Sequence, residues 1–493
     1  MAISANDTDV LIVGAGPVGL FLANECARRG LRWKLIEERS SQSVHSKALA
    51  IFPRTLEIFD MAGLVAPFLE EANRVTAVAV ITHGHTLAHM RFAPEESPYS
   101  FIAMVPQNVT EDLLLRALRN RGGDVEYETK FVSAEQQDGS VTVTIDRNGK
   151  RSNAKASFVV GCDGAHSTVR HGLGLTLEGG EYQDSFMLAD IETNNALPSD
   201  ELQLCPSELG PVAIFPMSAE RRRVVATIDQ PQGEAPSLEL VRKILAERAP
   251  AGIEARALRW SSYFRIHHRH AAHLRAGRVF LAGDAAHVHS PFGGQGMNTG
   301  LHDSWNPVWK LDLFLRGHGN ESLLESYEAE RLPVIKGVIH TTDTLTKVMG
   351  TPNKFVQLLR DAVIPMVSRL APFQHAFVER LSELGIAYRG SPIIEGPGTR
   401  YFEDSIRGGN GIGSRFLLLL DSDTASTEAA KQLFEAFQSV LESRPSTHHG
   451  LTLVRPDGYI AFSAAHSGPS ELESVRSLLQ RQVTQPERTR SAS

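Results

Sequence analysis

Asp9–Gly19, DVLIVGAGPVG, is the segment of this 493-residue sequence from which its fold class can be inferred. Its first five residues are mostly apolar and β-prone, as in a buried parallel strand, and they run directly into a G-x-G-x-x-G pattern that begins at Gly14. An apolar helical pattern follows and ends at Arg28-Arg29-Gly30, which suits a helix C-terminus. Strand, glycine turn and helix in this order predict a dinucleotide-binding unit, because the glycines let a pyrophosphate approach the helix N-terminus.

A second strand is predicted at Trp33–Ile36, and it ends at Glu37. An acid at this distance from the glycines binds the ribose hydroxyls of an adenosine. It also repels a 2′-phosphate, so we expect the site to hold FAD or NAD and not NADP. The residues predicted to contact this half of the dinucleotide are Gly14, Gly16, Pro17, Gly19, Glu37 and Glu38.

Val279–Asn298, VFLAGDAAHVHSPFGGQGMN, is where we expect the reaction. A short apolar strand, Arg278–Ala282, stops at Gly283-Asp284, where a carboxylate accepts hydrogen bonds from a ribityl or ribose hydroxyl. The next loop is rich in glycine, which lets backbone approach a flat ligand closely before a helix begins near Met297. The free N–H groups of that helix favour an anion, such as a reduced flavin.

Composition and charge limit the class of protein. Hydrophobic residues make up 42% of the chain and charged residues 22%, which fits a globular protein of about two to four domains. A formal net charge of −7 and the lack of a Lys/Arg block argue against nucleic-acid binding. The polar N-terminus lacks a signal-peptide pattern and Phe416–Leu420 is too short to cross a bilayer, so we expect a cytoplasmic protein without membrane contact. The three cysteines form no C-x-x-C pair, so redox chemistry must come from a bound cofactor.

Several motifs together resemble those of one enzyme family. GDAAH followed by P-x-G-G-Q-G-M-N resembles the second FAD motif of the single-component, class A flavin monooxygenases, the para-hydroxybenzoate and phenol hydroxylase-like aromatic hydroxylases. Asp163–Arg170 resembles their D-G-x-x-S-x-V-R motif, which closes over the FAD pyrophosphate. Lys47–Gly63 and VPQNVTEDLLLRAL at Val105–Leu118 are similar to further segments beside the flavin.

The resemblance implies an α/β protein with a Rossmann-like FAD-binding domain of the PHBH-like fold. This domain is expected at 1–180 and 266–395, and a β-rich substrate domain at 181–265, with parts of 75–105, is inserted into it. The tail, 396–493, resembles a thioredoxin-like domain without redox cysteines, with strand 415–420, helix 426–441, a strand pair turning at Pro456-Asp457-Gly458 and helix 471–482.

The resemblance also implies site residues. The further FAD contacts are Lys47, Arg54, Gln107, Asp163, Gly283, Asp284, Pro291, Gly294, Gly296, Met297 and Asn298, with Pro291 and Gly294 flanking the flavin hydroperoxide. Lys47 stands where the family often has arginine, and Leu49–Ile51 where phenol hydroxylase-like relatives carry an aspartate base, so no catalytic base is identified. Phe186, Phe215, Met217 and Tyr263 are candidates for an apolar substrate pocket, although aromatic residues in strands also fit a core.

The implied function is hydroxylation of a phenolic or polyketide-like aromatic compound, through a C4a-hydroperoxyflavin, by an FAD-dependent monooxygenase that uses NAD(P)H and O₂. In the resembled family NAD(P)H binds transiently as a co-substrate, and the single nucleotide fingerprint of this chain agrees with that expectation. The alternatives are a flavin-dependent reductase or oxidase on the same fold, or a non-catalytic FAD-binding partner protein. No metal is expected, because the histidines at 267–273 lack a completing ligand set. A monomer and a homodimer both remain open.

Proline positions predict how the helical region is divided. Glu321–Leu384 is predicted to be mostly helical, with breaks near Pro333, Pro352, Pro365 and Pro372. Pro307 is expected to kink the helix that follows the second FAD motif.

Overall fold

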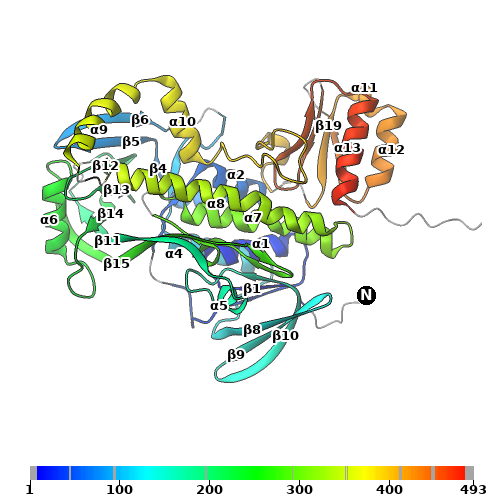
Figure 1. The fold of residues 1–493 in the computed structure, drawn as a ribbon, viewed down its shortest axis with the longest axis horizontal. Helices are drawn as coiled ribbons and strands as arrows, with labels where there is room; N and C mark the ends of the chain where they lie inside the picture. Colours follow the sequence, from blue (N-terminus) through cyan, green and yellow to red (C-terminus); the bar gives the residue numbers. More distant parts are fainter. Residues whose placement is uncertain are drawn as a thin grey trace, which may run out of the picture.

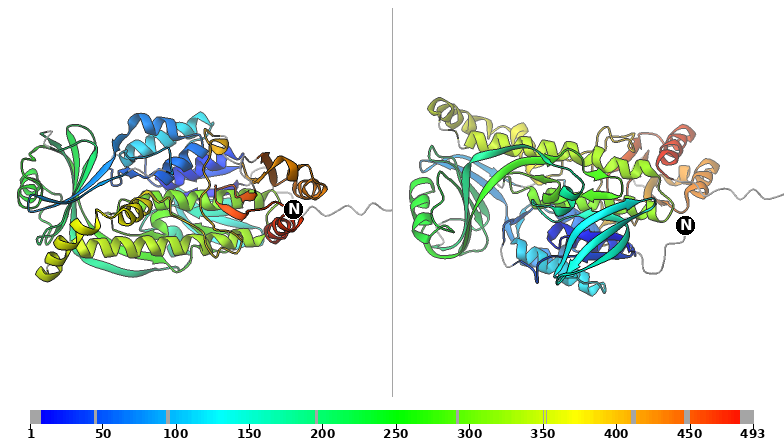
Figure 2. Two further views of the ribbon diagram at one scale, coloured as in Figure 1. Left: turned by 90° about the horizontal axis from the view of Figure 1, so that it is seen from above. Right: turned by 60° about the horizontal axis from the view of Figure 1, so that its bottom comes forward.

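The computed structural model is an elongated α/β molecule (Figures 1 and 2). A largely antiparallel sheet forms one end, a mixed sheet with a parallel centre and its helices forms the middle, and the C-terminal unit forms the other end. The structure describes residues 8–43, 46–92, 96–194, 197–290, 293–349, 351, 353–409, 413–445 and 450–483. The predicted α/β fold class is confirmed.

The central sheet places β1 between two parallel partners, β10 and β2, and β17 continues the sheet beyond β10. Parallel strands buried on both faces need apolar residues throughout, and β1 has five buried residues in a row. β8 and β9 extend β10 into a long hairpin. The strands are β1 (Thr8–Val13), β2 (Trp33–Ile36), β8 (Thr129–Gln137), β9 (Ser140–Arg147), β10 (Lys150–Gly161), β16 (Arg275–Ala276) and β17 (Val279–Leu281).

A second, eight-stranded sheet has the order β18-β15-β11-β14-β13-β12-β5-β6. Its two faces carry separate apolar clusters, because side chains alternate along each strand. Its strands are β5 (Ala77–Thr82), β6 (His85–Arg91), β11 (Leu177–Thr193), β12 (Glu201–Cys205), β13 (Val212–Pro216), β14 (Arg221–Ile228), β15 (Ala255–Ala271) and β18 (His287–Val288). A small sheet is formed by β3 (Ala50–Ile51), β7 (Ile102–Met104) and β4 (Asn73–Val75), and each of its strands contributes to one of these clusters.

Helices pack on the central sheet, and α7 and α8 run side by side along the molecule (Figure 1). The predicted breaks at Pro333 and Pro365 are wrong, since α8 and α9 continue through them. Pro333 lies on the exposed side of α8, where a carbonyl that loses its helical partner is solvated. The helices are α1 (Pro17–Arg28), α2 (Pro53–Met61), α3 (Val65–Glu71), α4 (Gln107–Asn120), α5 (Thr168–Gly172), α6 (Leu238–Arg248), η1 (Gly283–Ala285), α7 (Gly296–Leu315), α8 (Glu321–Met349), α9 (Lys354–Val367), α10 (Ala371–Ser382) and η3 (Asp404–Ile406).

The break predicted near Pro372 is confirmed. Pro372 lies in the first turn of α10, where a proline needs no backbone partner. Helix α7 runs without interruption through Pro307. Pro352 lies outside the described residues.

The C-terminal unit is a four-stranded sheet, in the order β20-β19-β21-β22, with helices packed on it. Its core is continuous with Trp309, Leu313 and Leu323 of α7 and α8, so the unit is packed onto the body. The helix predicted at 426–441 is shorter, because a strand begins at Leu441. The elements are β19 (Phe416–Leu420), α11 (Ser422–Ala425), α12 (Glu428–Phe437), β20 (Leu441–Pro445), β21 (Leu451–Val454), β22 (Ile460–Ala464) and α13 (Pro469–Gln482).

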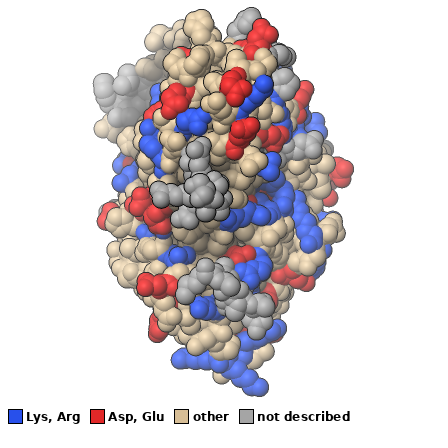
Figure 3. Space-filling view, turned by 90° about the vertical axis from the view of Figure 1, so that its right-hand side faces the viewer, with Lys and Arg blue, Asp and Glu red and all other residues tan. Residues whose placement is uncertain are grey.

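The end of the molecule that carries this unit is mixed in charge. Lysine and arginine side chains alternate with aspartate and glutamate across the face shown in Figure 3. Within the described part of the chain, no helix is both long enough and apolar enough to span a membrane.

Candidate cofactor and substrate site

The glycine turn after β1 is closely packed against the end of β10. Gly14 has a φ of +100°, and a Cβ there would lie 2.5 Å from the carbonyl oxygen of Cys162. A Cβ on Gly19 would lie 1.9 Å from the carbonyl oxygen of Gly14. Both positions therefore require glycine for packing within the protein.

Gly16 differs, because a Cβ there would meet no atom within 4 Å. It is the N-cap of α1, has no side chain to cap the helix, and is followed by Pro17 in the first turn. The first N–H groups of α1 therefore face open space and carry the positive end of the helix dipole. An anionic pyrophosphate fits this position, and a side chain at Gly16 would enter the same space.

Glu37 fixes the glycine turn to the end of β2. Its carboxylate accepts hydrogen bonds from the backbone N–H of Ala15, at 2.8 Å, and from the Arg39 guanidinium, at 2.9 Å. Burial alone would raise the pKa of Glu37, but the hydrogen bonds from Arg39 and Ala15 lower it, so the group is an anion. Glu38 is exposed, with Lys130 4.0 Å away.

Asp284 lies just beyond the end of β17. Its side chain is exposed, yet desolvation by the surrounding protein raises the pKa of its carboxyl, while His287 and Lys47 lower it. We interpret an accessible carboxyl in such crowded surroundings as the floor of a recess. Because Lys47 lowers the pKa of Asp284, its side chain must lie near the same recess. Lys47 is a predicted cofactor residue from a distant part of the sequence.

The D-G motif joins the ends of β10 and β17. Asp163 accepts hydrogen bonds from the Ser167 hydroxyl, at 2.5 Å, and from the Val169 N–H, at 3.1 Å. The buried Arg170 donates to the carbonyl of Ala285, at 3.0 Å, and so ties this loop to the Gly283-Asp284 turn. Because β1, β10 and β17 are parallel and in register, three motifs far apart in sequence meet at one edge.

The glycine-rich loop before α7 is held by Asn298. The Asn298 amide donates to the carbonyls of Ala50, at 2.9 Å, and Gly294, at 3.2 Å, and accepts from the Phe52 N–H, at 3.0 Å. Gly294 has a φ of +64°. Asn298 is fully buried, so it orients the loop from within the protein. Gly296 begins α7, Met297 is buried beside it, and Pro291 lies outside the described residues.

The segment that carries Lys47 is clamped from two sides. Gln107, at the start of α4, accepts from the Ala48 N–H at 3.1 Å and donates its own N–H to the Ala48 carbonyl. Arg223 of the eight-stranded sheet donates to the carbonyls of Lys47, at 2.8 Å, and Ala48, at 3.1 Å, while Asp190 binds its other side. The Lys47 side chain itself is exposed.

Arg54 is directed elsewhere. Its fully buried guanidinium pairs with Glu57 at 2.9 Å, lies 4.8 Å from the ring centre of Tyr459, and donates to the carbonyl of Asp457. These partners place Arg54 between α2 and the C-terminal unit, and they give no support to the predicted cofactor contact.

One face of the eight-stranded sheet gathers three of the four predicted pocket residues. Phe186, Phe215 and Met217 belong to the apolar cluster on this face, and the ring of Phe264 stacks on Phe186 at 5.8 Å. Tyr263 lies on the opposite face, where its hydroxyl donates to the Gln232 carbonyl. The alternation of β15 therefore corrects the prediction, and Phe264 takes the place expected for Tyr263.

A buried ionic network lies beneath the recess, and sequence reasoning missed it. Asp303 accepts hydrogen bonds from His287 Nε2, at 2.7 Å, Arg331 Nε, at 2.8 Å, and the Gly283 N–H, at 3.1 Å. Burial alone would raise the pKa of Asp303, but Arg331 and His287 lower it. Asp303 therefore fixes the turn that carries Asp284. The signal in the sequence is weak, because Asp303 lies between His302 and Ser304 on the predicted helix after Gly296, where an acid also fits an exposed helix face.

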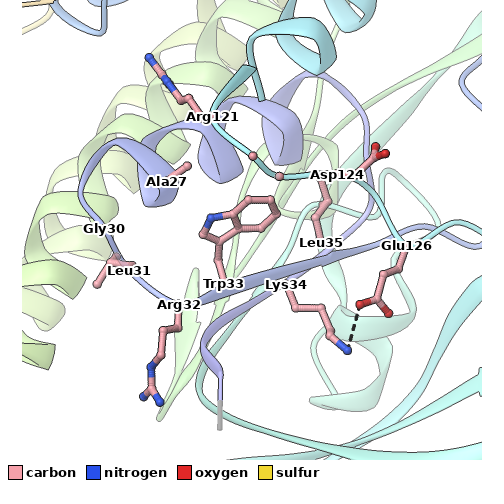
Figure 4. A pocket seen from close by; sticks show the side chains of 12 residues that line it. Ala27, Gly30, Leu31, Arg32, Trp33, Lys34, Leu35, Arg121, Asp124 and Glu126 are labelled. Atoms are coloured by element: carbon pink, nitrogen blue, oxygen red, sulfur yellow. Dashed lines mark ion pairs between the residues drawn. The ribbon is translucent and has the colours of Figure 1, made fainter. Parts of the chain in front are cut away.

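A cavity of about 480 Å³ lies at the opposite end of β2 (Figure 4). Trp33, Gly123 and the end of α1 line it. Lys34 pairs with Glu126 at 3.0 Å, and Arg121 donates to the backbone carbonyls of Asn24 and Ala62. Because the predicted cofactor residues lie at the carboxyl ends of the strands, this cavity is separate from their recess.

Comparisons with known proteins place the chain among flavoproteins. The family model described as "FAD binding domain" matches residues 7–342. The 6-methylpretetramide 4-monooxygenase of Streptomyces rimosus is 30% identical, over 95% of this chain and 93% of that protein. The pentachlorophenol 4-monooxygenase of Sphingobium chlorophenolicum is 30% identical, over 70% and 65% respectively. The solved structure of the anhydrotetracycline hydroxylase OxyS from Streptomyces rimosus is 28% identical, with a TM-score of 0.79, covering 97% of this chain and 99% of that chain.

Proposed function

Because this chain belongs to the FAD-binding family of flavin-dependent aromatic monooxygenases, we propose that the recess at the carboxyl ends of β1, β10 and β17 is its FAD site. The observation that carries the proposal is the convergence of three features at this edge. They are an uncapped helix N-terminus at Gly16, the anionic Glu37 and the accessible carboxyl of Asp284.

Each part of the FAD has a matching group in this proposal. The pyrophosphate lies against the N-terminus of α1 beside Gly16, and the adenosine ribose lies beside Glu37. Asp284 accepts hydrogen bonds from the ribityl chain. The ring lies against Gly294 and the start of α7, whose positive dipole end favours the reduced flavin. When bound, FAD supplies the redox and oxygen chemistry of the reaction.

We assign the substrate to the apolar face that carries Phe186, Phe215 and Met217. This cluster includes Phe52 and Met104, and Phe52 is hydrogen bonded to Asn298 beside the glycine-rich loop. An apolar surface so close to the proposed flavin position holds a flat ring in place and excludes water. A phenolic or polyketide-like aromatic compound fits this surface, and the 6-methylpretetramide and pentachlorophenol monooxygenases among the relatives support that class.

Further proposals concern the electron donor and the domains. We propose that NAD(P)H binds transiently, because the sequence contains one dinucleotide fingerprint and Glu37 opposes a 2′-phosphate there. The FAD-binding domain then comprises 1–180 and 266–395, and the substrate domain 181–265 with strands from 75–105. The segment 396–493 is a thioredoxin-like domain that takes no part in electron transfer, because it contains no cysteine.

Isotope labelling tests the proposed reaction. Phenolic and polyketide-like aromatics are screened for those that accelerate NAD(P)H oxidation, and the product of the best one is then formed under ¹⁸O₂. One labelled oxygen atom should enter the product, and flavin reduction should accelerate on the order of tenfold with the true substrate. An oxygen derived from solvent would contradict the monooxygenase. Reduction that is fast and indifferent to every aromatic would favour a reductase or oxidase on this fold.

A further inference from the structure

Glu383, at the C-terminal end of α10, is a buried acid under two constraints. Its side chain is almost fully enclosed, with the residue 3% exposed. Its φ of +62° is left-handed, a conformation that residues with a Cβ rarely adopt. Among the described residues, neither of its carboxyl oxygens has a hydrogen-bond partner. Both constraints oppose the closed position of Glu383, so other contacts must hold it there.

His302 of α7 faces this carboxyl. His302 Nε2 lies 3.6 Å from Glu383 Oε2 and 3.0 Å from the Thr55 hydroxyl, and both side chains are buried. His302 Nδ1 has no hydrogen-bond partner within the described part of the chain. The two groups are therefore opposed across the contact between α10 and α7, and a small side-chain rotation brings them into hydrogen-bond distance.

The two arginines near Glu383 and His302 are paired with other carboxylates. Arg331 binds Asp303 through Nε at 2.8 Å, and Arg54 pairs with Glu57 at 2.9 Å. The charged or titratable groups around Glu383 and His302 are Asp303 of α7, Arg331 of α8, Arg54 of α2 and Tyr388 after α10. No direct ion pair from this set reaches the Glu383 carboxyl among the described residues.

Burial raises the pKa of Glu383 to about 8, even though Arg331 acts to lower it. Burial, with Arg331 and Arg54, places the pKa of His302 well below its usual value. Near neutral pH, the pair is therefore an uncharged acid beside an uncharged imidazole. An ionised Glu383 would be a buried anion without a direct partner.

Helix α10 connects this pair to the apolar face and to the glycine-rich loop. Phe377, Val378 and Leu381 of α10 pack on the apolar face that carries Phe186. The carbonyl of Arg380 accepts a hydrogen bond from Gln295, in the glycine-rich loop, at 3.3 Å. Helix α10 therefore covers the apolar face and contacts the loop, and Glu383 is the residue at which it turns back into the body.

We infer that Glu383 and His302 form a latch, which holds α10 over the apolar face while the carboxyl is protonated and releases α10 when the proton leaves. The latch rests on this geometry and does not depend on the reaction. Its consequence, control of substrate entry by pH, rests on the proposed function.

The direction of the effect follows from the two states of Glu383. In the closed state the pKa is about 8, and in the open state the carboxyl returns to its ordinary value near 4.5. Protonation therefore stabilises the closed state fully below the open-state pKa. This stabilisation decreases as pH rises from the open-state pKa toward 8. Above pH 8 the opening equilibrium no longer changes with pH. Between pH 6 and pH 8, the opening equilibrium should increase by at least roughly tenfold.

Hydrogen exchange of the α10 peptide, corrected for the intrinsic rate at each pH, measures this opening without reference to activity. The wild type is compared with Glu383→Gln, which keeps the shape but cannot ionise, and with Glu379→Gln on the same helix, where the side chain is 52% exposed. Wild type and Glu379→Gln should open increasingly from pH 6 to pH 8. Glu383→Gln should open to the same small extent throughout.

Three outcomes would overturn the latch. One is an opening equilibrium that stays constant in the wild type, which decides the question even if Glu383→Gln does not fold. Another is an undiminished pH dependence in Glu383→Gln. The third is loss of the pH dependence in Glu379→Gln as well, which would assign the effect to the helix surface.

Discussion

Single glycines in the first turn have different roles, and the structure separates them. Gly14 and Gly19 are required because neighbouring backbone leaves no room for a Cβ. Gly16 has room, so its glycine is explained by the ligand that we assign to this position. Both requirements are local in sequence, which is why the motif alone predicted the turn.

Gly16→Val should abolish FAD binding with little loss of stability. The valine side chain extends into the space beside the N-terminus of α1, where the pyrophosphate is proposed to lie. Bound flavin is measured by its absorbance and by its release on denaturation. Gly337→Val, in an open position of α8, is the matched control and should retain flavin. Full flavin occupancy in Gly16→Val would show that the pyrophosphate binds elsewhere.

Asp284→Asn should weaken FAD binding by about 1–3 kcal/mol, the value of a hydrogen bond to a charged acceptor. Fluorescence titration of the apoprotein measures the affinity. Because the pKa of Asp284 is raised, its carboxyl should become protonated at a higher pH than that of an ordinary aspartate. The FAD affinity of the wild type should therefore begin to fall at that higher pH. Asp138→Asn, on the exposed β8–β9 turn, should leave the affinity unchanged. Equal affinities in the two variants would remove Asp284 from the FAD site.

At the scale of elements, the sequence predicted helices and strands well where the pattern is local. The strand Trp33–Ile36 and the helix ending at Arg28 agree with the structure. Helix α6 was missed because it lies in a β-rich stretch, although Ser237 caps it and its apolar residues have helical spacing. The continuation of α8 through Pro333 depends on packing that no single segment reveals.

The contact of α7 with α8 is predicted to depend on the Asp303–Arg331 pair. Arg331→Met leaves Asp303 buried with less compensation, so unfolding free energy should fall by about 3–5 kcal/mol in urea denaturation at neutral pH. Arg116→Met on α4, whose pair with Asp112 is exposed on both sides, should cost less than about 1 kcal/mol. A similar small cost for both variants would mean that the buried pair does not hold α7 to α8.

Acid should reduce this difference. Arg331 and His287 lower the pKa of Asp303, so the stability that Asp303 contributes is present above its unfolded pKa and is lost as pH falls through the lower folded pKa. The gap between wild type and Arg331→Met should narrow over this acidic range. A gap that is independent of pH would contradict the ionic origin of the effect.

For the whole molecule, the C-terminal unit is attached through buried charge. Arg455, in the turn between β21 and β22, binds Glu330 of α8, and the Asp457 carbonyl accepts from Trp305 of α7 at 2.9 Å. The sequence predicted the turn but not the helices that it contacts, because a local pattern does not identify a partner more than 100 residues away. For the same reason, Arg54 was assigned to the flavin when its partners include Tyr459.

Arg455→Met should therefore destabilise the body as well as the C-terminal unit. Glu330 keeps Lys310 but loses a buried partner, and the expected cost is about 3 kcal/mol. Urea unfolding is followed by fluorescence of single-tryptophan variants. Trp309 reports on this junction and Trp260 on the distant eight-stranded sheet.

Arg476→Met on the surface of α13 is the control, and its effect should stay below about 1 kcal/mol. Both tryptophans should report one shifted transition in Arg455→Met. Separate transitions, with that of Trp260 unshifted, would show that the C-terminal unit unfolds independently.

The central sheet also constrains the order in which the nascent chain can fold. β2 follows β1 closely in the sequence, yet β10, the other parallel neighbour of β1, ends at Gly161, and the turn that carries Asp284 follows more than 100 residues later. Arg455, which pairs with Glu330, is synthesised more than 100 residues after it. Until these partners are synthesised, the nascent chain exposes apolar strand edges and unpaired charge to chaperones, and the proposed cofactor site cannot form before the Asp284 turn exists.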